Sequence, residues 1–412
     1  MERKSSYYRM VVFLATVILI VFLTPCLVTA GNSGVKIGLL VPLTGRAATI
    51  GQEVRDATLL AVDDINRGGG IKSLGGAKIK LIVADTGGKP EVGMSETERL
   101  IKSEHVIAII GAYSSGVTFA CTQISEKYKV PHLVNISVAD KITERGFKYI
   151  FRISFKASWN AIANLKFAHW MGEITGKKAK RVVFLYEDSL WGQSTAKAWR
   201  KKAGEYGFEI VGDFPHPTNL MDVTGTVSKI KAVNPDIIFE IGVTPDAILI
   251  TKTMREYDVY PNIARICSGG GHSDPKYFEA VGKAADCEFL NLMWSPLMKH
   301  PRIKDTNERH KNRFGYDMLD FSGFAYTAPW VLVDAINRAG STDNEAIRKA
   351  LSKTDLGIDD PGILLAFPIR FDETGQAPAE GCFAQWLKGV KEIIYPKKMA
   401  TADPVWPAPK PW

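Results

Sequence analysis

Short apolar runs alternate with helix-length segments along most of this 412-residue chain. An apolar run at 35–41 precedes apolar residues at helical spacing between 54 and 65. A strand-like run at 78–84, a helix at about 90–103 and a run at 106–111 repeat the order. This β-α-β-α-β order predicts a parallel sheet with helices on both faces.

The second half of the chain repeats this alternation from residue 181. Strands are predicted at 181–187, 209–214, 236–242 and 264–268, and helices between them at about 191–206, 223–233 and 245–257. At roughly 150 residues per domain, the length also indicates two domains. We therefore expect an α/β protein with two lobes. Five prolines in segment 396–412 predict an extended surface tail.

The first thirty residues have the pattern of a secretory signal peptide. Basic residues occur within the first ten positions, an apolar run spans 11–23, and small residues at 28–30 form a cleavage signal. The apolar run is shorter than the ~20 residues that span a bilayer. We expect cleavage after Ala30 and a periplasmic or otherwise extracytoplasmic protein. Lipidation at Cys26 is the lesser alternative, because Pro25 stands where such signals place a small residue.

Charge and cysteine content bear on the partners and ligands. The formal net charge is +8, but basic and acidic residues are interleaved, so no nucleic-acid partner is expected. C-x-x-C and H-E-x-x-H motifs are absent from the sequence, so no metal site is expected. Four cysteines follow residue 30: Cys121, Cys267, Cys287 and Cys382. Cys267 and Cys287 are either a disulfide or isolated buried thiols.

The stretch GAYSSGVTF, residues 111–119, follows a buried strand and begins a helix. Ligands of parallel sheets sit beyond the carboxyl ends of strands, where helix N-termini offer unpaired N–H groups. Ser114 and Ser115 there suit a carboxylate or another small polar group. The alternative is that Ser115 only caps the helix. The loop at 42–52 occupies the corresponding position after the first strand.

Known catalytic and nucleotide-binding motifs are absent from this sequence. No G-K-[ST] follows the loop at 42–52, no G-x-G-x-x-G follows a strand, and no G-x-S-x-G elbow occurs. The seven histidines are scattered without a nucleophile partner. We therefore expect neither an enzyme nor a cofactor.

Several ordered segments carry a family resemblance. They are VKIGLLVPLTGRAATIGQEVRDATLLAVDDINRGGGI, IAIIGAYSSGVTFACTQISEKYKVPHLVNISVADKITERGFKYIFRIS and VVFLYEDSLWGQSTAKAWRKKAGEYGFEIVG, after the signal peptide. Across nearly the whole mature chain, the sequence resembles the periplasmic solute-binding subunits of branched-chain amino acid ABC transporters, the leucine/isoleucine/valine-binding family. The resemblance is strong for the family and much weaker for the ligand.

The resemblance implies a type I periplasmic-binding-protein fold, with two Rossmann-like lobes joined by a three-crossing hinge. Lobe 1 would contain residues 35–151 and 288–364, and lobe 2 residues 152–287 and 365–395. The ligand would bind between the lobes, shift the population toward a closed form, and be delivered to a membrane ABC permease. We expect a monomer.

Site residues are carried over from the family position by position. Ser115 matches the serine that binds the ligand α-carboxylate, and Tyr113 and Ser114 line the same loop. The next loop is matched by Ile136, Ser137 and Val138. Val138 stands where the family has a threonine, and Ser137 is the residue that would compensate for the lost hydroxyl.

Three further residues bear on the nature of the ligand. Trp191 matches an aromatic residue that closes over it, or else belongs to the core. Gly270 stands where amino-acid binders of this family have a glutamate for the ligand ammonium. A desolvated ammonium without a carboxylate is costly, so either another acid replaces it or the ligand has no ammonium. Glu240 is the candidate acid, and its alternative is a solvent-facing glutamate at a strand end.

Two ligand classes remain open. Ser115 and Glu240 favour a small amino acid, whereas Gly270, Val138 and Trp191 favour a carboxylate without an amine, such as an aromatic or organic acid, or an amide. A ligand sensor domain is the alternative to a transport subunit, although such domains are usually joined to a signalling or transmembrane partner.

Overall fold

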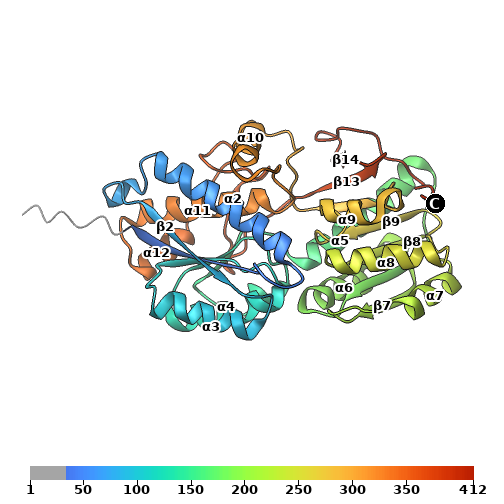
Figure 1. The fold of residues 1–412 in the computed structure, drawn as a ribbon, viewed down its shortest axis with the longest axis horizontal. Helices are drawn as coiled ribbons and strands as arrows, with labels where there is room; N and C mark the ends of the chain where they lie inside the picture. Colours follow the sequence, from blue (N-terminus) through green and yellow to red (C-terminus); the bar gives the residue numbers. More distant parts are fainter. Residues whose placement is uncertain (1–33) are drawn as a thin grey trace, which may run out of the picture. The chain divides into compact units, whose positions relative to one another are not determined.

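The computed structural model describes residues 34–412, so the predicted signal peptide at 1–30 lies outside the described residues. Within residues 35–412, a five-stranded sheet and a seven-stranded sheet form the centres of two lobes (Figure 1). We call them lobe 1 and lobe 2. In this part of the chain, none of the helices has the length and apolar character needed to cross a membrane.

The sheet of lobe 1 has the strand order β2-β1-β3-β4-β5, and each neighbouring pair is parallel. Its strands are β1 (Val35–Val41), β2 (Ile79–Asp85), β3 (Ala108–Ile110), β4 (His132–Val134) and β5 (Ile150–Arg152). Helices that belong to this lobe are α2 (Ala48–Arg67), α3 (Pro90–Lys102), α4 (Ser115–Tyr128), α10 (Ile303–Phe314), α11 (Ser322–Ala339) and α12 (Asn344–Leu351). The short strands β11 (Asp355–Leu356) and β12 (Ile369–Arg370) form a separate antiparallel pair.

Side chains of β1 alternate between the two faces of this sheet. Ile37 and Leu39 pack with the apolar faces of α2 and α11, whereas Leu40 packs with Leu100 of α3 and Val117 of α4. Figure 1 shows α2 and α11 on one side of the sheet and α3 and α4 on the other. A parallel strand covered on both faces is apolar throughout, which is the pattern of the sequence here.

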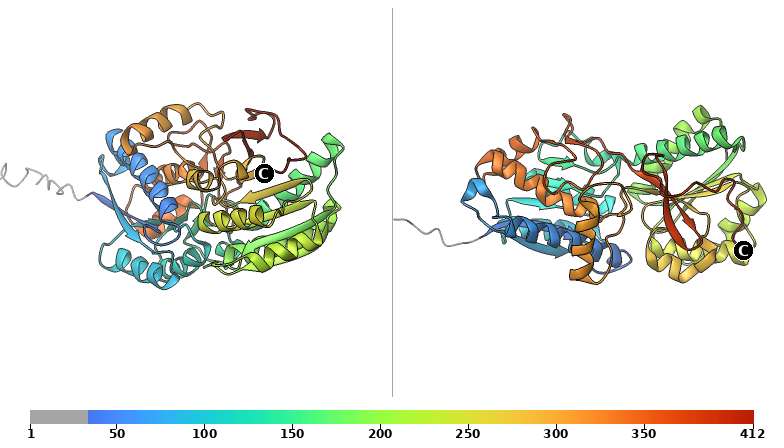
Figure 2. Two further views of the ribbon diagram at one scale, coloured as in Figure 1. Left: turned by 45° about the vertical axis from the view of Figure 1, so that its right-hand side comes forward. Right: turned by 90° about the horizontal axis from the view of Figure 1, so that it is seen from above.

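The sheet of lobe 2 has the order β14-β13-β10-β9-β8-β6-β7. Its strands are β6 (Arg181–Glu187), β7 (Glu209–His216), β8 (Ile237–Ile241), β9 (Ala264–Ser268), β10 (Phe289–Leu292), β13 (Cys382–Leu387) and β14 (Val390–Tyr395). The helices are α5 (Ala157–Thr175), α6 (Leu190–Lys202), α7 (Thr224–Val233), α8 (Thr244–Glu256) and α9 (Pro275–Val281). The red ribbon of β13 and β14 is the antiparallel edge of this otherwise parallel sheet (Figure 2).

Both faces of the second sheet are also covered. Phe184 of β6 packs with Trp199 of α6, their ring centroids 5.0 Å apart. The neighbouring residues Val183 and Leu185 face α7 and α8 instead. The two predicted α/β halves are therefore present as two doubly covered sheets.

The chain passes between the two sheets after β5, after β10 and before β13. Two predicted lobe boundaries are wrong in detail. Residues 289–292 form β10 and pair with β9 and β13, so they belong to lobe 2 rather than lobe 1. Residues 365–376 remain with lobe 1, because Gln376 bridges Arg152 beside β5 and its amide oxygen accepts a 2.5 Å hydrogen bond from the Arg152 Nε.

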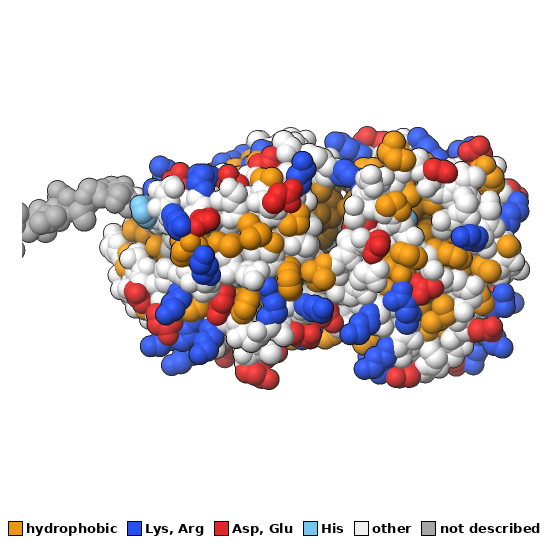
Figure 3. Space-filling view, turned by 90° about the horizontal axis from the view of Figure 1, so that it is seen from below, with side chains coloured by type: hydrophobic (Ala, Val, Ile, Leu, Met, Phe, Trp, Pro, Cys, Tyr) orange, Lys and Arg blue, Asp and Glu red, His pale blue; other side chains and the backbone are white. Residues whose placement is uncertain are grey.

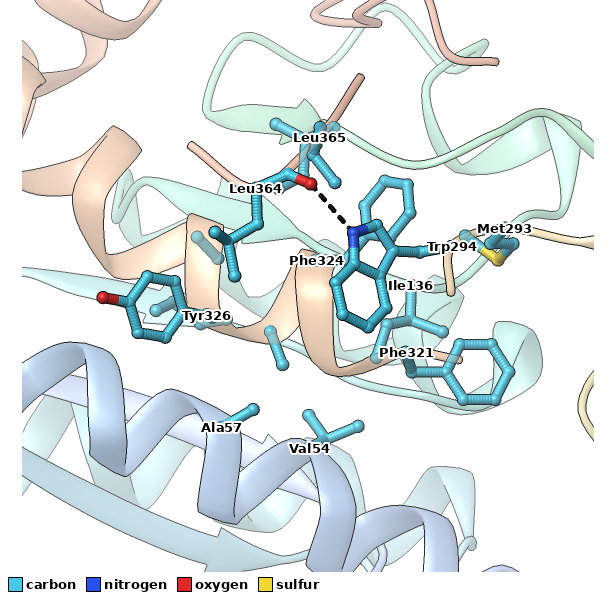
Figure 4. Packing of buried hydrophobic residues seen from close by; sticks show 14 of the residues in the cluster. Val54, Ala57, Ile136, Met293, Trp294, Phe321, Phe324, Tyr326, Leu364 and Leu365 are labelled. Atoms are coloured by element: carbon cyan, nitrogen blue, oxygen red, sulfur yellow. Dashed lines mark hydrogen bonds between the residues drawn. The ribbon is translucent and has the colours of Figure 1, made fainter. Parts of the chain in front are cut away.

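The main core of lobe 1 extends beneath α11 (Figure 4). Trp294 is buried there, and its indole Nε1 donates to the carbonyl oxygen of Leu364 over 2.8 Å. Phe321 and Ile136 lie beside Trp294 and extend this core toward the carboxyl ends of the strands. This packing places the segment after β10 and the start of α11 against the loop after β4.

The proline-rich tail is extended, as predicted, but it does not lie wholly on the surface. Trp406 is 9% exposed and packs edge-on against Phe289 of the second sheet. The Ala408 N–H donates to the carbonyl oxygen of Ile263 over 2.7 Å. Apolar residues between the prolines therefore anchor the tail to lobe 2.

Candidate functional site

A cavity of about 590 Å³ opens at the carboxyl ends of the strands and is lined by residues of both lobes. Ligand pockets are typically ~300–1,000 Å³, so this volume suits a small molecule. Figure 3 shows apolar side chains inside a hollow, on a face where basic and acidic side chains are otherwise interspersed. Eight of the nine predicted site residues line the cavity: Tyr113, Ser114, Ser115, Ile136, Ser137, Val138, Trp191 and Gly270.

Ser115 is the first residue of α4 and joins two loops of lobe 1. Its hydroxyl oxygen accepts the backbone N–H groups of Val138 at 3.3 Å and Ala139 at 3.2 Å. The residue is only 6% exposed. Because both bonds use lone pairs, its hydroxyl hydrogen is left to donate. Because Ser115 Oγ is bonded to the loop after β4, the alternative that this side chain serves only as a helix cap is wrong.

Ser137 lies in the loop after β4, and its hydroxyl is already hydrogen-bonded within lobe 1. It donates to the carbonyl oxygens of Ala112 at 2.5 Å and Tyr113 at 2.8 Å, and it also pairs with the Thr118 hydroxyl. The expectation that Ser137 compensates for the hydroxyl missing at Val138 is therefore wrong. The isopropyl group of Val138 makes this part of the wall apolar.

Two aromatic rings pack against the glycine loop after β9. Gly269 has φ of +95° and Gly270 of +87°, which strongly favour glycine. A Cβ atom at Gly269 would lie 2.0 Å from the ring of Trp191, and one at Gly270 would lie 2.7 Å from the ring of Phe321. The ring of Phe321 packs edge-on against the ring of Tyr113, with the ring centroids 5.5 Å apart. The space beside residue 270 is thus filled by an aromatic ring, so a glutamate side chain would not fit there in this arrangement.

Glu240 does not line the cavity, and neither of its predicted environments is correct. It is fully buried in the middle of the second sheet, within β8. The Nε of Arg265, on the neighbouring strand β9, donates to Glu240 Oε2 over 2.8 Å. His272 Nε2 lies 2.9 Å from Glu240 Oε1. The strand pairing turns this side chain toward a buried cation rather than toward solvent or ligand.

Glu288 completes this network of buried charges. It accepts from Arg265 Nη1 over 2.6 Å, and its other oxygen lies 3.2 Å from His272 Nδ1. Burial alone would raise the pKa of Glu240, but Arg265 and His272 lower it to about 2. Burial opposes the protonation of His272, yet the charge of Glu240 raises its pKa above the usual range. Two carboxylates are thus paired with a guanidinium and an imidazolium.

Glu240, Cys267 and His272 present ligand atoms within 4.8 Å of one another, a grouping that can hold a metal ion. Burial raises the pKa of the Cys267 thiol to about 11, so it is protonated near neutral pH. A divalent cation would also add to the positive charge that Arg265 already supplies.

All four cysteines after residue 34 are free thiols, including Cys267 and Cys287, so the disulfide alternative is wrong.

Ion pairs between charged side chains connect the two lobes around the cavity. Arg46, before α2, pairs with Asp246 of α8, whose pKa burial raises to about 6 despite this partner. Lys391 of β14 contacts Asp320, before α11, at 2.9 Å. Behind Asp320, Glu53 accepts the Phe321 N–H over 2.7 Å; burial and Asp320 raise the pKa of Glu53 to about 8.

Several cavity residues were not predicted from the sequence. Arg46, Glu187, Met293, Asp320 and Phe321 all line it. Two of them carried a signal: Arg46 lies in the loop at 42–52, and Glu187 is an acidic residue at the carboxyl end of a strand. The others come from segments that only the three-dimensional packing brings to this place.

A family model and a related protein sequence each match most of the chain. A family model described as periplasmic binding protein matches residues 34–391. Leu/Ile/Val-binding protein homolog 7 of Brucella abortus (strain 2308) is 28% identical over 386 residues, covering 90% of this chain and 94% of that protein.

Two solved structures have the same overall fold. The branched-chain amino acid transporter substrate-binding protein LivJ of Streptococcus pneumoniae, in complex with isoleucine, matches with a TM-score of 0.77 at 22% identity, covering 88% of this chain and 100% of that one. A solute-binding protein of an ABC transporter from Rhodopseudomonas palustris BisB5, in complex with 3,4-dihydroxybenzoic acid, matches with a TM-score of 0.73 at 22% identity, covering 85% and 92%.

Proposed function

Because the chain belongs to the periplasmic binding protein family, we propose that it binds a small amino acid or a related carboxylate in the cavity and delivers it to an ABC importer. The chain has the type I periplasmic-binding-protein fold, and it is a solute-binding protein of the ABC transporter type, with the extracytoplasmic location that this family implies. Proteins of this family and fold are substrate-binding subunits of transporters rather than enzymes.

The observation that carries the ligand class is the position of Ser115. A buried serine at a helix N-terminus, with a hydroxyl hydrogen free to donate, faces a cavity of suitable size. Backbone N–H groups of the first turn of α4 point the same way, so a carboxylate is the group that this corner favours. Trp191 of lobe 2 lines the same cavity.

Contacts between the lobes support binding by hinge closure. The pairs Arg46–Asp246 and Lys391–Asp320 each join one lobe to the other at the cavity. Lys276 Nζ also donates to Thr49 Oγ1 over 3.0 Å across the same boundary. In this mechanism, a ligand that contacts both lobes shifts the population toward the closed form, which the permease would recognise.

An aromatic or other organic acid is the second candidate ligand. The wall is largely apolar, with Trp191, Phe321, Met293 and Val138, and Gly270 supplies no carboxylate for an ammonium. A neighbour of the same fold is in complex with 3,4-dihydroxybenzoic acid. Both candidates place a carboxylate at Ser115.

A thermal-shift screen tests the proposal as a whole. The purified protein, freed of carried-over ligand by unfolding and refolding, is tested with leucine, phenylalanine, 4-methylpentanoate, 3-phenylpropanoate and benzoate. A true ligand at about 100 times its Kd should stabilise the protein by about 2.7 kcal/mol. Absence of any shift across this panel would contradict the ligand class.

Ser115→Ala tests the carboxylate corner. We expect the variant to weaken binding of whichever panel compound shifts the wild type by about 1–3 kcal/mol, because the ligand carboxylate and the N–H groups of the second loop lose a buried partner. Isothermal titration calorimetry measures the change. Ser228→Ala, at an exposed position of α7, is the control and should bind as the wild type does. Equal affinity in Ser115→Ala would remove this residue from the site.

A further inference from the structure

Glu187 is a buried carboxylate that lines the cavity without a partner. It is the last residue of β6, in lobe 2, and only 9% of it is exposed. Among residues 34–412, no hydrogen bond or ion pair reaches its carboxylate oxygens. The carboxylate oxygens remain accessible from the cavity. A ligand that excludes water from the cavity would leave this carboxylate without a partner, which is unfavourable, so the position favours a ligand with a cation.

The other charged residues on the cavity wall are either paired or exposed to solvent. The charged lining residues are Arg46, Lys89, Glu187 and Asp320. Arg46 is paired with Asp246, and Asp320 with Lys391. Lys89 is exposed and makes no ion pair with Glu187. Glu187 is therefore the buried charged residue on this wall that makes no ion pair of its own; His216 lies opposite it on β7.

The surroundings of Glu187 also favour a cation. Burial raises the pKa of the Tyr113 phenol in lobe 1, and the charge of Glu187 raises it further. Trp191 follows four residues later, at the start of α6, and lines the same cavity. Aromatic rings that line the same cavity as a carboxylate make a favourable environment for an ammonium group.

We propose that Glu187 binds a cationic nitrogen of the ligand, which makes the ligand an amino acid or a similar zwitterion rather than a simple carboxylic acid. This inference rests on the proposed function, in which Ser115 of lobe 1 holds the carboxylate. The cation then pairs with lobe 2, so that the two charged ends of one ligand join the two lobes. Glu187 supplies the negative charge that residue 270 lacks.

Matched ligand pairs and one isosteric variant test this assignment. The probes are leucine with 4-methylpentanoate and phenylalanine with 3-phenylpropanoate, each pair differing by the ammonium group. Calorimetry on the wild type should give an affinity at least about 100-fold higher for the amino acid of a pair. Glu187→Gln should lower affinity for that amino acid by about 100-fold, as expected for losing one member of a desolvated charge pair, and should leave or improve affinity for the deaminated acid.

Asp188→Asn is the matched control. Asp188 is the next residue, is exposed, and accepts a 2.7 Å hydrogen bond from Gln193 rather than facing the cavity. Its variant should keep the wild-type preference. Unliganded Glu187→Gln should also unfold at the same temperature as the wild type or higher, because it removes a charge without a partner.

The outcomes separate this inference from the function on which it rests. If deaminated acids bind the wild type as tightly as amino acids do, the solute-binding proposal stands and the assignment of Glu187 is overturned. An equal loss of both members of a pair in Glu187→Gln would likewise overturn it, by indicating a structural role. If neither pair stabilises the wild type, the ligand class itself fails and the inference falls with it.

Discussion

Glu240→Gln should lower the free energy of unfolding by about 3–5 kcal/mol, the usual cost of removing one partner from a buried ion pair. Glu240 is fully buried and contacts both Arg265 and His272. Glutamine has nearly the same shape but no charge, so Glu288 alone would face a guanidinium and an imidazolium. Urea unfolding at pH 7 measures the change.

Glu209→Gln is the control for this variant. Glu209 begins β7 in the same lobe, and 53% of its side chain is exposed, with Lys180 4.0 Å away. Glu209→Gln should change the free energy of unfolding by no more than about 0.5 kcal/mol. A loss below about 1 kcal/mol in Glu240→Gln would contradict the view that the network carries ionised groups.

The effect of Glu240→Gln should also depend on pH. The pKa of Glu240 is lowered to about 2 in the folded protein, against about 4.3 in an unfolded chain. Its stabilising contribution is therefore fully present above about pH 4.3 and is lost as pH falls through the folded pKa. The stability difference between wild type and variant should shrink from pH 7 to pH 3. A constant difference would mean that Glu240 acts through packing alone.

The architecture could be predicted because apolar runs and helical periodicity reflect burial directly. The run at 35–41 is β1, and the predicted strand at 181–187 is β6. Trp191 was predicted only from the family resemblance. Ser115, which begins the helix after β3, could be predicted from that position, since the fold brings the carboxyl ends of the strands to one edge. These features depend on local sequence and general topology, which a single chain contains.

The partner of Glu240 could not be predicted, because it depends on strand register. Glu240 pairs with Cys267 across β8 and β9, which places Arg265 of the neighbouring strand beside it. One signal was available: Glu240, Arg265 and Glu288 are charges within or beside apolar strands, and such charges need partners. Glu187 was missed for a different reason, since what distinguishes it is that no ion pair reaches its carboxylate among residues 34–412, which only the three-dimensional structure can show.

Gly269→Ala is the second variant with a large expected effect, a loss of about 2–6 kcal/mol in unfolding free energy. A non-glycine residue at φ of +95° is strained by about 1–3 kcal/mol. The new Cβ would also lie 2.0 Å from the ring of Trp191, and such overpacking costs about another 1–3 kcal/mol. The displaced ring would enter the cavity, so affinity for the ligand should fall as well.

Gly69→Ala separates the two contributions. Gly69 has φ of +105°, but a Cβ atom there meets nothing within 4 Å, so only the backbone term of about 1–3 kcal/mol remains. Adding Trp191→Ala to Gly269→Ala removes the clash and should bring the cost of the glycine change down to that of Gly69→Ala. Thermal and urea unfolding of Gly69→Ala, Gly269→Ala, Trp191→Ala and the double variant of Trp191 and Gly269 completes the cycle. Equal costs for Gly69→Ala and Gly269→Ala would show that Trp191 does not press on the glycine loop, and the indole would then be free to leave the cavity wall when the lobes separate.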